Sequence, residues 1–403
     1  MNTVRSISEN VRYIGCSDRR LKLFENVYPV PQGISYNSYV ILDDETALTD
    51  TADQAVSEAF MDNLTAALGG RALDHLIIHH MEPDHGANIA NVVRAYPNVK
   101  IHCTAGAVRM LQQFAGADIA GLAAPVKEGE KLCLGEHCLT FLTAPMVHWP
   151  EVMVSFEEKE GLLFSADAFG TFGALGGSLW ADRIGYGPKE KDEYRRYYAN
   201  IVGKYGRQVQ ALLKKAAALD IKAVLPLHGP LWRGDISPLL KDYDLWSRYE
   251  GEGGAVIFCG TIYGHTLRAA EKLAAMLDDR GAEDVRVYDI SGQEVSFLVA
   301  EAFRCRAAVF AASSYNAGVF HPMEVLLHDL KAHDWQNHTV AFLENGTWAP
   351  SAGKTMRAIL DGAALTILDE TLTVRSALTD ENEAALGAMA DALAAALKGA
   401  SIS

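Results

Sequence analysis

Seven side chains with the chemistry of metal ligands occur at a spacing that suits two ions. Two histidines and two acids lie within the run 80–85, of sequence HMEPDH, and three further candidates follow at long intervals. The candidates are His80, Glu82, Asp84, His85, His148, Asp167 and His228. A carboxylate has two oxygens and can join neighbouring ions, so we expect one of the three acids to bridge and open positions to remain for a small substrate. The pattern predicts a binuclear metal site.

Glu82 bears on the identity of the metal. A related zinc-hydrolase motif would carry histidine at this position, and the extra carboxylate makes the site harder and more anionic, which favours iron or manganese over zinc. His79 is adjacent but out of register, so we assign it a structural role, together with His75 and His102. The alternative for the run is a polar loop that caps a helix.

The elements around these residues place them at strand ends. The run 80–85 follows the short apolar segment 73–78 and precedes a helical stretch, so it forms a strand-to-helix loop. Paired strands are expected within 27–52 with a turn at Asp43-Asp44, and a helix over 190–218. Further strands are predicted at 99–103, 138–144, 152–156, 161–166 and 223–227. His148, Asp167 and His228 each come just after such a strand, so they can converge on one edge.

A second constellation suits a mononucleotide. The strand 255–259 leads into the loop 260–266, GTIYGHT, and then into a helix, where backbone N–H groups can hold a phosphate. Two more loops with aromatic residues, 313–318 and 344–353, follow later strands and can sandwich an isoalloxazine ring. The predicted cofactor contacts are Thr261, Ile262, Tyr263, Gly264, His265, Thr266, Ser313, Ser314, Tyr315, Asn316, Ala317, Gly318, Asn345, Gly346, Thr347, Trp348, Ala349 and Gly353.

Strands and helices alternate regularly after the polar, Gly-rich segment 249–254, which is interpreted as a linker. This alternation predicts a parallel sheet with helices on both faces. Two domains follow, at 1–250 and 254–403. The strands are expected at 255–260, 285–290, 307–312, 339–344 and 364–369, and the helices near 265–280, 294–302, 321–332, 352–361 and 380–397.

Composition excludes several classes of protein. The formal net charge of −15 argues against a general nucleic-acid binder. No signal peptide and no apolar stretch long enough for a bilayer are apparent, so we expect a cytoplasmic protein without a membrane partner. The six cysteines are scattered and include no CxxC pair, which indicates reduced thiols and no fused rubredoxin or zinc-ribbon module.

The motifs together resemble flavodiiron proteins, also called A-type flavoproteins. The likeness rests on HxExDH at 80–85, His148 before Trp-Pro, Asp167 in SADAFG and His228 in LHGP, with segments 35–39 and 197–201 also similar. It implies an α/β chain with an N-terminal metallo-β-lactamase-like αββα sandwich and a C-terminal flavodoxin-like doubly wound parallel sheet. The assignment that the resemblance implies is His80, Glu82 and His148 on one iron, Asp84, His85 and His228 on the other, and Asp167 as the bridge.

The resemblance also implies an activity. Two irons per subunit would reduce dioxygen to water, nitric oxide to nitrous oxide, or both, with electrons delivered through FMN. Tyr197 and Tyr198 are candidates for a hydrogen bond to the bound diatomic, although both also suit packing. The family forms a head-to-tail homodimer, or a dimer of such dimers. The donor would be a separate rubredoxin, a flavin reductase or a deazaflavin cofactor.

Two other functions are consistent with parts of the pattern. A binuclear zinc hydrolase with a regulatory flavodoxin domain uses the same fold, and Glu82 argues against it. The third hypothesis is a redox sensor that binds flavin and iron but has no catalytic turnover.

Overall fold

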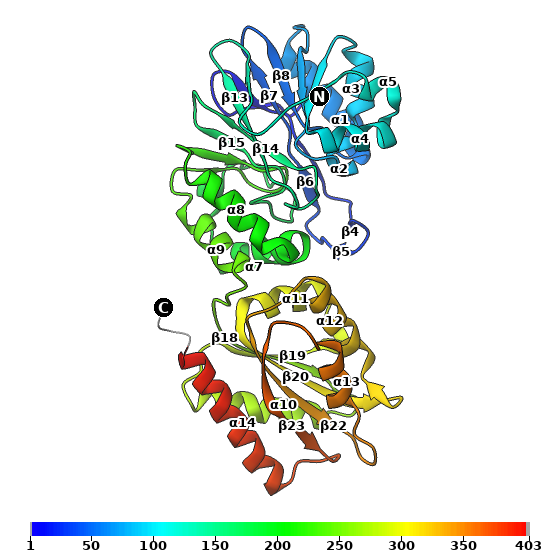
Figure 1. Cartoon of the computed structure of the whole chain (residues 1–403), viewed down its shortest axis with the longest axis vertical. Coiled ribbons are helices and arrows are strands. Elements are labelled where there is room, and N and C mark those ends of the chain that lie inside the picture. Colours follow the sequence, from blue (N-terminus) through cyan, green and yellow to red (C-terminus); the bar gives the residue numbers. More distant parts are fainter. Residues whose placement is uncertain (1, 400–403) are drawn as a thin grey trace. The chain divides into compact units, whose positions relative to one another are not determined.

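The computed structural model describes residues 2–399, and its contacts divide them into two units (Figure 1). Within the described residues, the first unit extends to Tyr198 and includes Arg207–Tyr243. The second comprises Ala199–Gly206 and the chain from Asp244 onward. The contacts therefore divide the chain after Tyr243, before the predicted domain boundary at 250–254. The predicted boundary itself remains a proposal.

The first unit is built on two sheets that face each other. The seven-stranded sheet has the order β1 (Arg5–Ser6), β2 (Val11–Tyr13), β7 (Tyr39–Leu42), β8 (Thr46–Thr49), β9 (His75–Ile77), β10 (Lys100–Cys103) and β11 (Ala123–Pro125). The six-stranded sheet has the order β12 (Lys131–Cys133), β13 (Cys138–Thr143), β14 (Met153–Glu157), β15 (Leu162–Phe164), β16 (Ala223–Leu225) and β17 (Trp232–Arg233). Ile41 and Ile77 of the first sheet share one buried cluster with Phe141 and Phe164 of the second. The predicted metallo-β-lactamase-like sandwich is confirmed.

Two hairpin-like pairs and several helices complete this unit. The pairs join β3 (Cys16–Asp18) to β6 (Ile34–Tyr36) and β4 (Leu23–Phe24) to β5 (Tyr28–Pro29). The helices are α1 (Ser57–Leu68), α2 (Pro83–Gly86), α3 (Ile89–Ala95), α4 (Ala105–Ala115), α5 (Ala117–Ala120), α6 (Ala181–Ile184), α7 (Pro188–Tyr197), α8 (Gly206–Ala216) and α9 (Ser237–Ser247). Figure 1 shows α1 and α4 beside the seven-stranded sheet, where they contact β7 and β11.

Local predictions in this unit are mostly confirmed. The paired strands β7 and β8 are antiparallel, with Tyr39 opposite Thr49 and the predicted turn between them. The helical pattern predicted over 190–218 is confirmed by α7 and α8, but the segment is not one continuous α-helix. A π-helical turn at Tyr198–Val202 and a 3-10 turn at Gly203–Tyr205 interrupt it. Glycine at 206 is required because a Cβ there would lie 2.3 Å from the carbonyl oxygen of Ser247.

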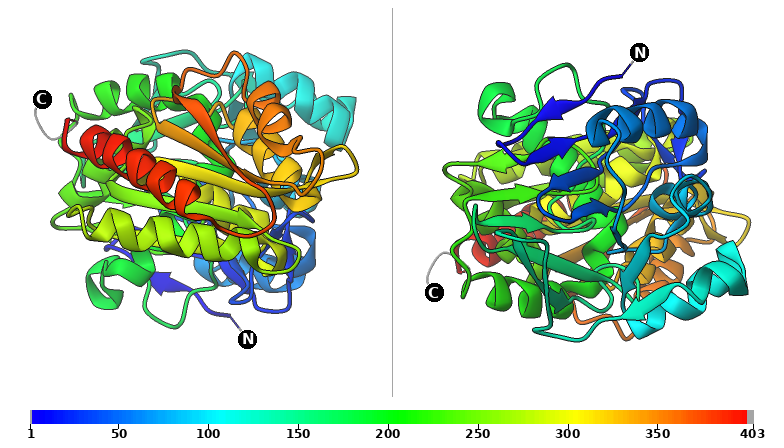
Figure 2. Two further views of the ribbon diagram at one scale, coloured as in Figure 1. Left: turned by 90° about the horizontal axis from the view of Figure 1, so that it is seen from below. Right: turned by 90° about the horizontal axis from the view of Figure 1, so that it is seen from above.

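The second unit has a five-stranded parallel core. Its order is β19 (Val285–Asp289), β18 (Gly253–Gly260), β20 (Cys305–Tyr315), β22 (Thr339–Asn345) and β23 (Thr366–Val374), with β21 (Gly318–Val319) paired to β20. The helices are α10 (His265–Asp278), α11 (Val295–Arg304), α12 (His321–Ala332), α13 (Ala352–Ile359) and α14 (Asp380–Gly399). The left view of Figure 2 shows α10 and α14 side by side on one face of the sheet, where both contribute to one buried cluster. The predicted flavodoxin-like topology is confirmed.

Two predictions need correction. The segment 249–254 is not a free linker, because β18 already begins at Gly253 and a Cβ on Gly251 would lie 2.6 Å from the backbone nitrogen of Arg306. The six cysteines are not all reduced thiols, since Cys133 and Cys138 form a disulfide. The spacing of the cysteines did not indicate this disulfide, because the two residues are brought together by the pairing of β12 with β13. Over residues 2–399, no helix is long and apolar enough to cross a membrane.

Candidate metal centre and flavin cavity

The candidate metal ligands lie in loops that follow strand ends, as predicted. Residues 80–85 come after β9, and α2 begins within them because Pro83 suits the first position of a helix. His148 follows β13, Asp167 follows β15 and His228 follows β16. The structure brings all seven side chains together in two groups of possible ligand atoms.

The first group joins His80, Glu82, His148 and Asp167. Oε2 of Glu82 lies 3.1 Å from Nε2 of His80 and 3.0 Å from Nε2 of His148. Oδ2 of Asp167 lies 3.4 Å from Nε2 of His80 and 3.6 Å from Nε2 of His148. Two imidazole nitrogens and two carboxylate oxygens therefore surround one point.

The second group joins Asp84, His85 and His228. Oδ2 of Asp84 lies 3.2 Å from Nε2 of each histidine, and the two Nε2 atoms are 3.0 Å apart. The other oxygen of Asp167, Oδ1, lies 3.4 Å from both of these nitrogens. Asp167 thus presents one oxygen to each group, which is the geometry of a bridging carboxylate.

The residues present fit metal ions. A metal–nitrogen bond of about 2.0–2.1 Å places ligand atoms of one ion roughly 3.0–3.4 Å apart, close to the separations within both groups. Within the described part of the chain, both oxygens of Asp84 and Oδ2 of Asp167 are buried without a hydrogen-bond partner. Buried carboxylate oxygens need a compensating charge, and a cation between the ligands supplies it.

Acids and imidazoles shift one another's protonation at this site. Burial lowers the pKa of His80, but hydrogen bonds to Glu151 and Glu82 outweigh burial and raise that pKa to about 9. Burial likewise opposes protonation of His148, yet Asp167 and Glu82 raise its pKa to about 10. Burial raises the pKa of Asp167, but the neighbouring histidines hold this pKa well below its ordinary value. A metal ion would therefore displace protons from imidazoles and find the acids already ionised.

Several supporting residues were missed in the sequence. Oε1 of Glu151 accepts hydrogen bonds from Nδ1 of His80 at 2.8 Å and from the backbone N–H of Met81 at 3.0 Å. Nδ1 of His228 donates to the carbonyl oxygen of Ser35 at 2.6 Å. Such partners fix the orientation of ligating imidazoles. Glu151 lies three residues after His148, and no local pattern marks it; Ser35 lies in a segment singled out only by resemblance.

The two tyrosines proposed from the sequence have different surroundings. Tyr197 is fully buried and its hydroxyl donates to Oδ1 of Asp167 at 3.1 Å. Burial and the nearby carboxylate raise the pKa of Tyr197 well above its ordinary value, so it is a neutral donor. Tyr198 is also buried and packs edge-on against Tyr243. His79 bonds to Asp50 and Ser155, in line with a structural role.

The three predicted cofactor loops line one cavity of about 560 Å³ in the second unit. They come together because β18, β20 and β22 are neighbours and end at the same edge. The lining residues are Thr261, Ile262, Tyr263, His265, Thr266, Ser313, Ser314, Tyr315, Asn316, Ala317, Asn345, Gly346, Thr347, Trp348, Ala349, Ser351 and Ser376.

Three of the predicted contacts do not line this cavity. Gly264 lies within the first loop, Gly318 belongs to β21 and Gly353 belongs to α13. The backbone N–H of Gly353 donates to Glu344, and a Cβ there would lie 2.6 Å from Thr371, so this glycine permits close packing of the helix on the sheet.

Two serines that line the cavity were not among the predicted contacts, although Ser351 lies within the predicted loop 344–353. Ser376 follows β23 and is held by reciprocal hydrogen bonds with Asn345: its backbone N–H donates to Oδ1 of Asn345, whose Nδ2 donates to its carbonyl oxygen. Ser351 immediately precedes α13, and its backbone N–H donates to Oγ of Ser314.

The cavity suits a flavin mononucleotide. Gly264 has a φ of +86°, which lets the loop turn into the N-terminus of α10, a helix of 14 residues whose positive end favours phosphate. Oγ1 of Thr261 accepts from the N–H of Gly264 at 3.1 Å and shapes the turn. Trp348 and Tyr263 are 88% and 90% exposed, so their aromatic faces are free to stack on a planar ring.

Comparisons with known proteins agree with this architecture. A family model described as "ODP family beta lactamase" matches residues 34–229. The nitric oxide reductase of Moorella thermoacetica is 28% identical over 370 residues, which is 91% of each chain. The structure of rubredoxin oxygen:oxidoreductase from Desulfovibrio gigas superimposes with a TM-score of 0.93 at 25% identity, over 98% of this chain and 99% of that one.

A further solved structure shows the same fold. The flavodiiron protein from Giardia intestinalis has a TM-score of 0.93 at 22% identity and covers 99% of this chain and 98% of its own. The two ligand groups joined by Asp167, the flavodoxin-like unit and these relatives lead to one conclusion: the chain is similar over nearly its whole length to flavodiiron proteins and to relatives named as oxidoreductases.

Proposed function

We propose that this protein reduces dioxygen to water, nitric oxide to nitrous oxide, or both, at two iron ions, with electrons that arrive through FMN. The main support for the proposal is the position of Asp167, because its Oδ2 lies beside His80 of one ligand group and its Oδ1 beside His85 of the other. Two relatives support the choice of substrates, because one is named a nitric oxide reductase and another a rubredoxin oxygen:oxidoreductase.

The proposed ligand sets follow the two groups. His80, Glu82 and His148 would hold one iron, Asp84, His85 and His228 the other, and Asp167 would bridge them. Three acids among seven ligands favour iron over zinc. Bound iron would supply electrons and open coordination positions for a diatomic molecule.

The protein's own groups would hold this site in one arrangement. With iron bound, Glu151 would keep the one remaining proton of His80 on Nδ1 and leave Nε2, beside Glu82 and Asp167, free to act as a ligand. Tyr197 donates to Asp167 and so reduces the negative charge on the bridging oxygen. We therefore propose for Tyr197 a positioning role on the bridge.

The flavin would bind in the cavity of the second unit. The N-terminus of α10 suits the phosphate, and the exposed faces of Tyr263 and Trp348 suit the ring. Bound FMN would accept electrons in pairs and release them singly. We further propose a head-to-tail homodimer, in which the flavin of one subunit serves the metal centre of its partner, and a separate donor such as a rubredoxin, a flavin reductase or a deazaflavin cofactor.

Metal and flavin analysis tests the proposal first. Two irons, one for each ligand group, and one FMN per chain are expected. Two zinc ions instead would favour a hydrolase. After anaerobic reduction, the protein should consume dioxygen or nitric oxide over many turnovers; a loaded protein that is reoxidised once without turnover would be a redox sensor. A monomer that keeps full flavin-to-iron transfer at high dilution would contradict the dimer.

A further inference from the structure

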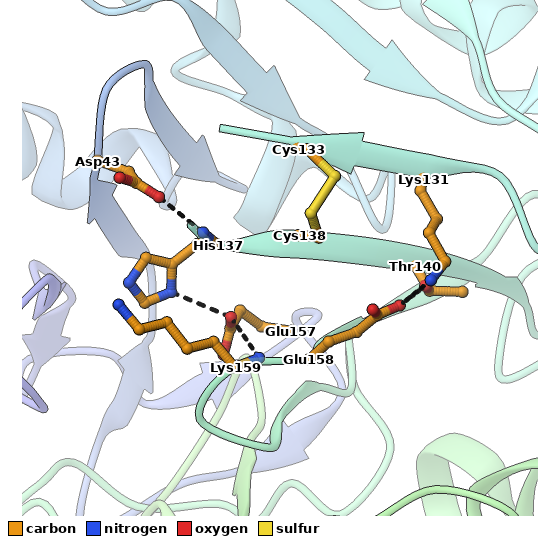
Figure 3. The surroundings of a disulfide bond; sticks show 9 residues. All are labelled: Asp43, Lys131, Cys133, His137, Cys138, Thr140, Glu157, Glu158 and Lys159. Carbon is orange, nitrogen blue, oxygen red and sulfur yellow. Dashed lines mark hydrogen bonds and ion pairs between the residues drawn. A yellow bond between two sulfur atoms is a disulfide. The ribbon is translucent and has the colours of Figure 1, made fainter. Parts of the chain in front are cut away.

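A disulfide lies on a surface strand of the first unit. Cys133 of β12 and Cys138 of β13 are bonded to each other and stand directly opposite in the antiparallel register (Figure 3). The two strands form a hairpin closed by residues 134–137, and β12 is the edge strand of its sheet. The bond therefore spans two neighbouring strands of one hairpin.

The bonded sulfurs can be reached from outside. Cys133 is exposed and Cys138 is half-buried, whereas Leu132 between Lys131 and Cys133 contacts the core. The remaining cysteines are buried thiols: Cys16, Cys103, Cys259 and Cys305. Burial raises the pKa of Cys16 to about 11 and of Cys103 to about 12, so thiolate is scarce in them. Among the cysteines of residues 2–399, the two that form the disulfide are therefore the ones that external reagents can reach.

The hairpin holds its shape through contacts that do not involve sulfur. The N–H of Leu134 donates to the carbonyl oxygen of His137 at 2.9 Å, and the N–H of His137 donates to Oδ2 of Asp43 at 2.7 Å. The His137 ring is fully buried between Glu157 and Asn10, at 3.0 Å from each. Reduction would leave these bonds in place, so the two thiols would remain opposite each other and could close again.

The disulfide is remote from the metal loops. The hairpin that carries the disulfide contacts Asp43 and Glu45, which lie in the turn before β8. The opposite end of β8 leads to Asp50, which bonds to His79 next to the candidate ligands. A strand rises roughly 3.3 Å per residue, so the length of β8 separates the two ends. The sulfurs therefore lie outside the candidate metal centre.

We propose that Cys133 and Cys138 form a reversible dithiol–disulfide couple that exchanges two electrons with an external dithiol. A thiolate of the external dithiol attacks Sγ of Cys133, the S–S bond breaks, and its electron pair goes to Sγ of Cys138, which takes up a proton. The second thiol of the reductant then resolves the mixed disulfide and releases Cys133 as a thiol. The external dithiol leaves as a disulfide, and its oxidised form reverses the reaction.

Differential alkylation of the native, fully loaded protein tests this couple. Dithiothreitol, or a reduced thioredoxin-type protein in a parallel arm, is removed by rapid desalting, and the protein is then treated with N-ethylmaleimide under native conditions and analysed by peptide mass mapping. We expect labels on Cys133 and Cys138 to rise from none to two, the four buried cysteines to stay unlabelled, and oxidised dithiothreitol to remove both labels. Reduction in one arm alone would identify the source of the reductant as a small molecule or a protein.

Two single variants sharpen the test. Cys138→Ser leaves the exposed Cys133 thiol, which should form a mixed disulfide with 5,5′-dithiobis(2-nitrobenzoate) faster than the half-buried thiol left by Cys133→Ser. Iron content and reductase activity should be unchanged in both. The proposal is overturned if the pair opens only after denaturation, or if both thiols are free in the native protein and oxidised dithiothreitol does not join them.

Discussion

Glu151 accepts a hydrogen bond from His80 at 2.8 Å, and both side chains are almost fully buried. When the ring is neutral, as metal binding requires, the carboxylate keeps its single proton on Nδ1 and leaves Nε2 of His80 facing Glu82 and Asp167. The pair thus joins a buried carboxylate of the core to the candidate metal centre.

Replacing Glu151 by glutamine should weaken metal binding without unfolding the protein. The amide has lost the charge that orients and polarises the imidazole, and the loss of such a partner costs about 10–100-fold in metal affinity. Competition with a chelator, followed by iron analysis, measures the change. Glu58→Gln, at an exposed position of α1, is the matched control and should behave as wild type.

Changing Glu82 to histidine should shift the metal preference. The substitution removes one of the three acidic ligands and makes the site softer and less anionic, which favours zinc. We expect most of the reductase activity to be lost and zinc to replace iron after growth in medium that contains both. A Glu82→His protein that keeps two irons and full turnover would show that iron retention does not depend on this carboxylate.

Metal affinity should rise with pH. In the metal-free protein the pKa of His80 is about 9 and that of His148 about 10, so both rings are protonated at neutral pH, and a metal ion must displace their protons. Affinity for Mn²⁺ or Co²⁺ should then increase about tenfold per pH unit for each proton displaced, and level off above these pKa values. Titrations of the apoprotein between pH 6.5 and 8.5 measure the slope; a flat profile would contradict the protonation assigned to the empty site.

Trp348 should contribute stacking energy to the flavin. Trp348→Ala removes an aromatic face that is exposed at the cavity, and an aromatic pair contributes about 0.5–1.5 kcal/mol beyond burial. We expect FMN to dissociate roughly two- to twelvefold more readily, as quenching of flavin fluorescence would report. Trp348→Phe keeps a ring and should recover most of the affinity.

Acid should destabilise the second unit through His338. Burial lowers the pKa of this histidine to about 4, while its Nδ1 donates to the carbonyl oxygen of Cys305 at 2.8 Å. Below pH 6.5, His338 of the unfolded chain binds a proton that the buried ring of the folded chain does not bind. The free energy of unfolding therefore falls until His338 of the folded protein is also protonated, near pH 4. Between pH 7.5 and 5 the loss is about 2 kcal/mol.

The matched variant for this effect is His338→Asn, whose amide can still donate to Cys305. Urea denaturation at pH 7.5 and pH 5 measures the free energy of unfolding of both proteins. On acidification, His338→Asn should lose about 2 kcal/mol less of this free energy than the wild type. Equal losses in the two proteins would mean that His338 is protonated in the folded state.

Much of the site was predictable because its information is local. Four of the seven candidate ligands lie within 80–85, and a strand followed by proline at the first position of a helix is enough to place them on a loop. The flavin loops were predictable for a related reason. Strands that alternate with helices must run parallel, so the residues that follow 255–260, 307–312 and 339–344 meet at one edge of the sheet.

Tertiary structure decided the contacts that join distant segments. Glu151 meets His80 across 71 residues, Ser376 enters the flavin cavity through Asn345, and Cys133 bonds Cys138 because the hairpin register sets them opposite each other. The π-helical turn after Tyr197 was equally hidden, as was the close approach of Gly206, where a Cβ would lie 2.3 Å from the carbonyl oxygen of Ser247. Residue type and spacing determine which groups are available and at which strand ends they lie. Which of them touch depends on strand register and packing, which act between residues far apart in the chain.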